Sequence, residues 1–166
     1  MRTDIRTLKV VVLTSCAALM AFAFIIADTA SVVTHAEMPG APSRMTGAPG
    51  ESTCTSCHSA TAQTGQSSLL APATYVPGQT YTSQVNATTS DLSRASWGFE
   101  MTSLTSSNTA AGTYSHSTSF TQTKTGTVSG GTRQYSTHTS SGTFAGQTGG
   151  TTWSFNWTAP ATNVGT

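Results

Sequence analysis

The chain has 166 residues, enough for one domain, with a formal net charge of +1 and only 8% charged residues. So few Lys and Arg side chains exclude a protein that binds nucleic acid through a basic patch. Serine (23 residues) and threonine (34 residues) make up about a third of the sequence, a composition typical of strands and turns rather than helices.

The N-terminus has the features of an export signal. Arg2, Arg6 and Lys9 form a positively charged start, and residues 10–27 follow without a charge. The small residues before Glu37 predict cleavage, which makes 1–36 a signal peptide. The alternative is an uncleaved membrane anchor, because the uncharged run is close to the shortest that spans a bilayer. In either case the rest of the chain is expected in the periplasm, at the cell surface or in the extracellular space.

The exported part divides into two regions by composition. Residues 37–68 are rich in Pro and Gly, contain few large apolar side chains, and are expected to form a loop segment. From residue 69 the pattern changes to short runs of alternating residues separated by Gly, Asn and Ser. This pattern predicts an all-β domain over residues 69–166, with the architecture of an immunoglobulin-like β-sandwich.

The expected strands are fewer than the roughly seven of an immunoglobulin-like sandwich. The chain also stops just after a predicted strand and turn, so we expect a C-terminally truncated fragment whose last strand is missing. Alternating aromatic residues near positions 97–101 and 153–157 are the predicted core. The predicted strands are 69–75, 79–88, 94–104, 112–121, 132–139 and 151–158, with a possible short one at 125–129.

The loop segment contains the motif that carries the chemistry. Cys54, Cys57 and His58 form the pattern C-x-x-C-H, the attachment signature of c-type haem. Two thiols at this spacing can add to the two vinyl groups on one edge of the porphyrin, and the adjacent His can ligate the iron as proximal ligand. Cys16 lies in the expected signal peptide, so these two cysteines are the ones that the mature chain keeps. The sequence therefore predicts one covalently bound haem c.

Other uses of the two cysteines stay open. Cys54 and Cys57 could form a disulfide, which is plausible outside the cytoplasm, and the domain would then be a secreted adhesion or ligand-binding sandwich without haem. A redox dithiol normally lies at a helix start in a βαβ context, which the pattern does not offer. A zinc site would need a second pair of cysteines.

Residues 47–58, which read GAPGESTCTSCH, resemble the start of exported bacterial reeler-like domains with a single haem motif, some of them described as choice-of-anchor proteins. The resemblance covers about residues 44–162. It implies a reelin-type β-sandwich, usually with one more strand than predicted here, and a haem. Four later blocks carry it as well: 75–81, 97–101, 135–139 and 153–160.

The sixth iron ligand is predicted from the position of the remaining histidines. His138 lies at a predicted strand end beside a turn, where a sandwich can present a ligand, and it belongs to one of the blocks that resemble the reeler-like family. His116 is the second candidate and Met45 a third. Five-coordinate iron is the other possibility, and an open sixth position would allow peroxidase-like or gas-sensing chemistry.

These observations favour an exported monohaem c-type cytochrome-like protein that transfers electrons to or from an unknown redox partner. An enzyme is less expected, since only three acidic residues follow Glu37 and no catalytic triad or phosphate loop is present. Arg44 and Arg133 are candidates to pair with haem propionates, but solvation at the surface is the expected role of each. Contact with a membrane is expected only through an uncleaved N-terminal segment or a missing C-terminal anchor, and no nucleic-acid partner is expected.

Overall fold

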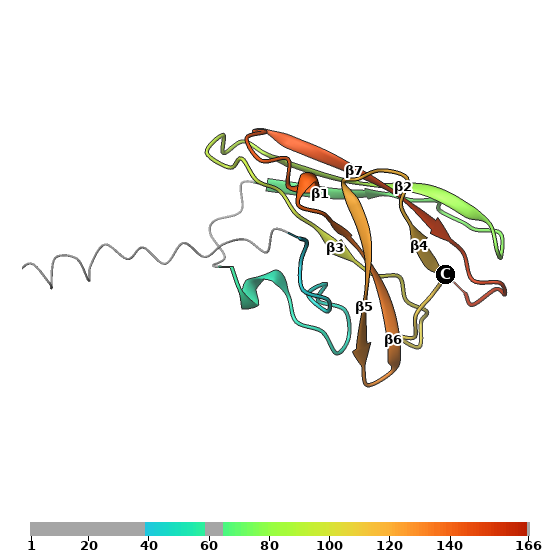
Figure 1. Ribbon diagram of the computed structural model, residues 1–166. Helices are drawn as coiled ribbons and strands as arrows, with labels where there is room; N and C mark the ends of the chain where they lie inside the picture. The colour runs from blue at the N-terminus through green and yellow to red at the C-terminus, as the bar shows by residue number, and fades with distance from the viewer. Residues whose placement is uncertain (1–38, 59–64, 166) are drawn as a thin grey trace, which may run out of the picture. The chain divides into compact units, whose positions relative to one another are not determined.

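A computed structural model describes residues 39–58 and 65–165, which contain seven β-strands and two short 3₁₀ turns (Figure 1). The turns are Cys54–Ser56 and Ser141–Thr143. The strands are β1 (Gly65–Leu70), β2 (Thr80–Thr89), β3 (Glu100–Met101), β4 (Thr113–Ser115), β5 (Thr121–Val128), β6 (Gly131–His138) and β7 (Gly150–Thr158).

The strands form two antiparallel sheets. One has the order β1-β2-β7-β4 and the other the order β3-β6-β5. The expected all-β class is thereby confirmed. The predicted signal peptide lies outside the described residues. Within 39–58 and 65–165, no helix has the length and apolar content needed to cross a membrane.

Three strands agree with their predictions to within one residue at each end, namely β2, β6 and β7. The others differ. β1 begins at Gly65, so the boundary that we placed between residues 68 and 69 falls inside this strand. In the predicted strand 94–104 only Glu100–Met101 form a strand, paired with β6, and Leu104 makes an isolated bridge to Ala110. In 112–121 only β4 and the first residue of β5 are extended, and the short strand at 125–129 is part of the longer β5.

The core between the two sheets is built on the inward face of β7. Trp153 and Phe155 alternate along this strand and are each 1% exposed. The ring of Phe99 lies 4.9 Å from that of Trp153 and 6.2 Å from that of Phe155. The predicted aromatic core is therefore confirmed at these positions, whereas Trp97 and Trp157 are only half-buried.

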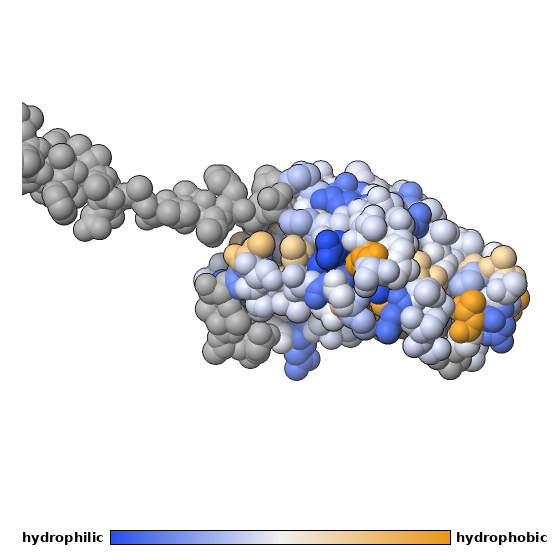
Figure 2. Space-filling model, turned by 90° about the horizontal axis from the view of Figure 1, so that it is seen from below, coloured by the Kyte–Doolittle hydropathy of each residue, from blue (hydrophilic) through white to orange (hydrophobic). Residues whose placement is uncertain are grey.

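The opposite face of the β3-β6-β5 sheet is covered by the chain that precedes the cysteine motif. Tyr135 and Thr137 of β6 point to this side and are completely buried. Figure 2, which shows the molecule from below relative to Figure 1, has a mostly weakly polar surface with isolated hydrophobic residues. The segment over 39–53, which we call the anchor segment, is thus packed onto the sheet and contributes to its burial.

Candidate functional site

The cysteine motif forms one exposed turn. The carbonyl of Cys54 accepts hydrogen bonds from the amides of Cys57 (3.2 Å) and His58 (3.0 Å), which closes the turn. Both thiols are free, and both cysteines and His58 are exposed. The motif therefore presents two thiols and an imidazole within five residues on a surface that a planar ligand can reach.

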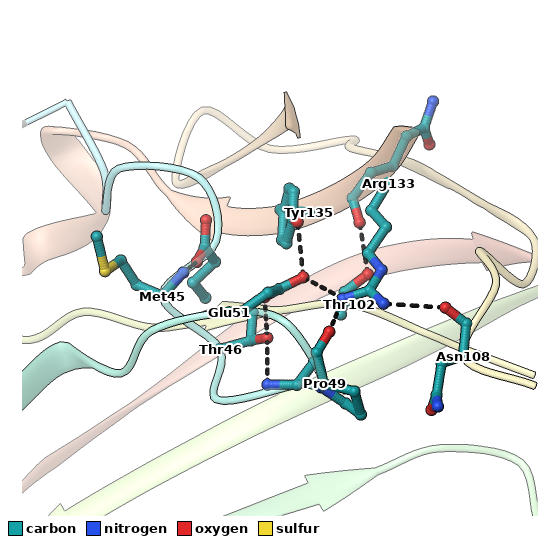
Figure 3. A network of polar contacts seen from close by, with 11 residues as sticks. Met45, Thr46, Pro49, Glu51, Thr102, Asn108, Arg133 and Tyr135 are labelled. Atoms are coloured by element: carbon teal, nitrogen blue, oxygen red, sulfur yellow. Dashed lines mark hydrogen bonds and ion pairs between the residues drawn. The ribbon is translucent and has the colours of Figure 1, made fainter. Parts of the chain in front are cut away.

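A buried ion pair fixes the chain just before this turn. The carboxylate of Glu51, three residues before Cys54, lies 2.6 Å from the guanidinium of Arg133, and the two side chains are 0% and 4% exposed. The Tyr135 hydroxyl donates to the same carboxylate oxygen at 2.7 Å, and the Thr46 hydroxyl donates to the other oxygen (Figure 3). Each oxygen of the buried carboxylate is therefore hydrogen-bonded, as a buried charge requires.

Arg133 ties three parts of the chain together. Besides Glu51, its guanidinium donates to the carbonyls of Pro49 and Asn108, each at 2.9 Å (Figure 3). The expectation that Arg133 is solvated at the surface is wrong, because it lies on the covered face of β6 beside Tyr135. These bonds direct the guanidinium toward the anchor segment, and its Nε is buried without a hydrogen-bond partner.

The protonation states of this network follow from its contacts. Burial raises the pKa of Glu51, but hydrogen bonds from Thr46, Arg133 and Tyr135 outweigh it, so the pKa lies below its ordinary value. Burial and the neighbouring carboxylate raise the pKa of Tyr135. At neutral pH the network therefore holds an ionised Glu51 and a neutral Tyr135.

Strand β5 holds the first half of the anchor segment. The Lys124 ammonium donates to the carbonyls of Gly40 (3.0 Å) and of the next residue (2.9 Å). The Ser43 hydroxyl donates to the carbonyl of Thr125 at 2.9 Å. At Gly126 a Cβ atom would lie 3.1 Å from the Cβ of Ser43, so the lack of a side chain lets the two backbones approach. The anchor segment is fastened to this sheet along its length.

A second carboxyl group, that of Glu100, lies beneath the anchor segment. Its Oε2 accepts a hydrogen bond from the Met45 amide at 2.7 Å, while its Oε1 is buried without a hydrogen-bond partner. Burial, with a smaller contribution from the charge of Glu51, raises the pKa of Glu100 to about 7. The Met45 carbonyl in turn lies 3.8 Å from the Cys54 sulfur. Met45 thus contacts both Glu100, through its amide, and Cys54, through its carbonyl.

Glu100 should make stability depend on pH. The pKa of Glu100 is raised from 4.5 in the unfolded chain to about 7 in the folded protein, so the unfolded chain releases this proton at a lower pH. The free energy of unfolding therefore falls as the pH rises from about 4.5 to about 7. We expect Glu100→Gln, which keeps an acceptor for Met45, to gain stability relative to the wild type between pH 5 and pH 8. Urea unfolding of both proteins at each pH measures this difference. A difference that is constant with pH would contradict it.

His138, the predicted sixth ligand, is enclosed at the end of β6. It is 7% exposed, and its Nδ1 lies 3.1 Å from both the backbone nitrogen and the carbonyl oxygen of Phe99. Burial lowers its pKa, so the ring is neutral at pH 7. Its Nε2 has no hydrogen-bond partner among the described residues. A Cβ atom on Gly98 would lie 2.6 Å from the ring, so Gly98 would have to move before the ring could ligate iron.

The other two candidates for the sixth ligand have different surroundings. Both ring nitrogens of His116 are engaged, Nδ1 with the hydroxyl of Thr121 at 2.9 Å and Nε2 with that of Thr123 at 2.8 Å. Met45 lies in the anchor segment, close to Cys54. Of the two histidines, only His138 has a ring nitrogen without a hydrogen bond, which is the state a ligand needs.

Comparisons with known proteins leave the site to be judged on its own chemistry. No protein-family model matches the chain, and neither a curated protein nor a solved structure matches it. In the part of the chain that the structure describes, no group of three or more His, Cys, Asp or Glu side chains is arranged to hold a metal ion.

Sequence reasoning missed the roles of Glu51 and Arg133. Their 82-residue separation gives no sign of pairing. One signal was available: Arg133 lies two residues before Tyr135 in a predicted strand, and so on the same face of β6. A charged residue on the same strand face as a buried aromatic residue is itself expected to be buried, and a buried charge requires a partner of opposite charge.

Proposed function

We propose that this chain is an exported monohaem c-type cytochrome-like protein that transfers electrons. Cys54 and Cys57 would hold the haem through thioether bonds, and His58 would be the proximal iron ligand. The observation that supports this most is the exposed turn that presents two free thiols and a following imidazole. This donor set fits the two vinyl groups and the iron of one haem, which supplies one-electron chemistry when bound.

The anchor segment gives this site a rigid base. The Glu51–Arg133 ion pair joins β6 to the chain three residues before Cys54, and the Met45 carbonyl lies close to the Cys54 sulfur. Covalent attachment to an anchored turn would limit movement of the haem relative to the sheets. A fixed position favours electron transfer because it reduces the rearrangement that each redox step requires.

We further propose that the domain is a reelin-type β-sandwich. The division into four and three strands is that of an immunoglobulin constant domain. The order differs, since the four-stranded sheet here contains the seventh strand where the immunoglobulin sheet contains the fifth. This difference in strand order argues against a constant-type topology. The resemblance of residues 47–58 to reeler-like domains supports the reelin type.

Export is part of the same proposal. The positively charged start and uncharged run of the first 27 residues support transport to the periplasm, cell surface or extracellular space. Covalent attachment suits that location, because haem lost outside the cytoplasm is not replaced from within. The electron donor and acceptor would be other redox proteins.

Haem staining after denaturation tests the proposal. We expect the chain, expressed with a c-haem maturation system, to stain for haem on a denaturing gel. The Cys54→Ala/Cys57→Ala variant should not stain, whereas each single variant should retain one thioether. Ser56→Ala, in the same turn, is the matched control and should stain like the wild type. An unstained wild type would favour a Cys54–Cys57 disulfide in an adhesion or ligand-binding domain.

The sixth ligand has its own test. If His138 ligates the iron, the haem is six-coordinate and low-spin, and His138→Ala should convert the spectrum to high-spin and let carbon monoxide bind the reduced protein. His116→Ala should change neither property, since both nitrogens of His116 are engaged by hydroxyls. An absorption spectrum with and without carbon monoxide measures both. A low-spin spectrum in His138→Ala would move the role to Met45 or His116.

A further inference from the structure

The two sheets differ sharply in charge. The strands β1, β2, β4 and β7 contain no charged residue. The other sheet carries Glu100, Lys124 and Arg133 on β3, β5 and β6. The outer face of the uncharged sheet presents hydroxyl and carboxamide groups, such as those of Thr82 and Asn156, which are hydrogen-bonded to each other at 3.1 Å.

A shallow hollow of about 640 Å³ lies at one end of this uncharged sheet. It is formed where the loop before β7 meets the ends of β2 and β7. No charged residue lines it. The residues that line it include two with carboxamides, two exposed threonines and one aromatic residue, namely Asn86, Gln147, Thr88, Thr152 and Phe144. The hollow is open to solvent, so it can contact one face of a ligand but does not enclose it.

The backbone of the hollow holds its aromatic ring in place. Phe144 has a left-handed φ of 45°, which is uncommon for a residue with a side chain, and it ends the 3₁₀ turn Ser141–Thr143. Its ring lies 5.0 Å from that of Phe120 and 6.0 Å from that of Trp153. Gly150 lets β7 lie close to β2 at this end of the sheet, since a Cβ atom there would lie 2.8 Å from the carbonyl oxygen of Ala87.

The polar groups of the hollow retain hydrogen-bonding capacity. The Thr152 hydroxyl donates to Asn86 Oδ1 at 2.7 Å, and Asn86 Nδ2 makes one long bond to Ser68 at 3.4 Å, which leaves its second N–H available. Gln147 Nε2 donates to the Gly150 carbonyl, while Gln147 Oε1 has no partner among the described residues. The hollow therefore offers a donor and an acceptor beside an apolar ring.

We propose that this hollow binds a neutral oligosaccharide. Sugar hydroxyls can both donate and accept, which matches the carboxamides and threonines, and the C–H face of a pyranose can pack on the Phe144 ring. A charged ligand would lose hydration without meeting an opposite charge. The site is independent of the cysteine motif, and its ligand would bring the exported domain to a glycan surface.

Titration of the purified protein with cellohexaose and chitohexaose, followed by ¹⁵N NMR, tests the proposal. We expect saturable shifts of the Asn86 and Gln147 side-chain amides with at least one of the two sugars. A charged hexamer of galacturonic acid should produce none. If neither neutral sugar shifts these amides at millimolar concentrations, or if the charged hexamer shifts them equally, the proposal is wrong.

Variants locate the binding. Phe144→Ala and Gln147→Ala should each weaken the affinity for the responding sugar, Phe144→Ala by about tenfold because it removes the only ring. Gln147 is exposed, so its variant remains informative should Phe144→Ala fail to fold. Thr82→Ala, on the same face but outside the hollow, should bind like the wild type. Loss of binding in Thr82→Ala, or unchanged affinity in Gln147→Ala, would overturn the assignment to this hollow.

Discussion

Replacing Arg133 by Ala is expected to lower the free energy of unfolding by about 3–5 kcal/mol, because it leaves a buried carboxylate without its counter-charge. The Glu51 side chain is fully buried, and its remaining partners, the hydroxyls of Tyr135 and Thr46, are neutral. The variant also removes the donors that bind the carbonyls of Pro49 and Asn108. Urea unfolding at pH 7 measures the loss.

The exposed ion pair of the same chain is the matched control. Arg94 lies 3.1 Å from Asp91, and their side chains are 57% and 34% exposed. An exposed pair of this kind contributes at most about 1 kcal/mol, so Arg94→Ala should be nearly neutral. Replacing both partners of the buried pair, with Glu51→Leu and Arg133→Met, should recover part of the stability lost in Arg133→Ala. Equal losses for Arg133→Ala and Arg94→Ala would show that the buried pair does not anchor the segment.

Replacing Trp153 by Ala should destabilise the domain by a comparable amount, about 3–5 kcal/mol, through loss of a buried aromatic side chain and the cavity that it leaves. Trp153 is 1% exposed, packs against Phe99 and Phe144, and donates its indole N–H to the Gly142 carbonyl at 2.7 Å. Denaturant unfolding again provides the measurement.

Trp97 is the appropriate comparison for Trp153. It is half-buried outside the strands, and its indole N–H donates to the Gln147 carbonyl at 2.7 Å. Because Trp97 buries less of its apolar surface in the folded protein than Trp153 does, Trp97→Ala should cost clearly less stability than Trp153→Ala. A larger loss for Trp97→Ala would mean that the centre of the core lies outside the inward face of β7.

Strands with apolar residues on one face could be predicted from the sequence. In β7, Trp153 and Phe155 alternate with Ser154 and Asn156, and the prediction was correct to one residue. In β5 the residues that face the other sheet include Thr121 and Thr123, whose hydroxyls bond to His116. Without an apolar alternation, this eight-residue strand was predicted only as a short one.

Register and loop packing could not be predicted in the same way. All residues of β1 are exposed, and β1 is defined by backbone pairing with β2, from Gly65 opposite Thr89 to Leu70 opposite Gln84. Its side chains therefore carry no burial pattern that would mark its ends. Of the candidate site, the cysteine motif is local and could be found by spacing. The contact between Glu51 and Arg133 depends on how the anchor segment lies on the sheet, which local patterns do not encode.

Mass spectrometry of the haem-attachment peptide tests the central claim most directly. Trypsin cuts after Arg44 and Arg94 and no Lys or Arg lies between them, so one peptide contains both Cys54 and Cys57. From protein matured with haem, we predict that residues 45–94 carry the mass of one haem and no thiol that reacts with iodoacetamide. The same peptide at its unmodified mass with two reactive thiols, or two hydrogens lighter as a disulfide, would contradict covalent haem attachment.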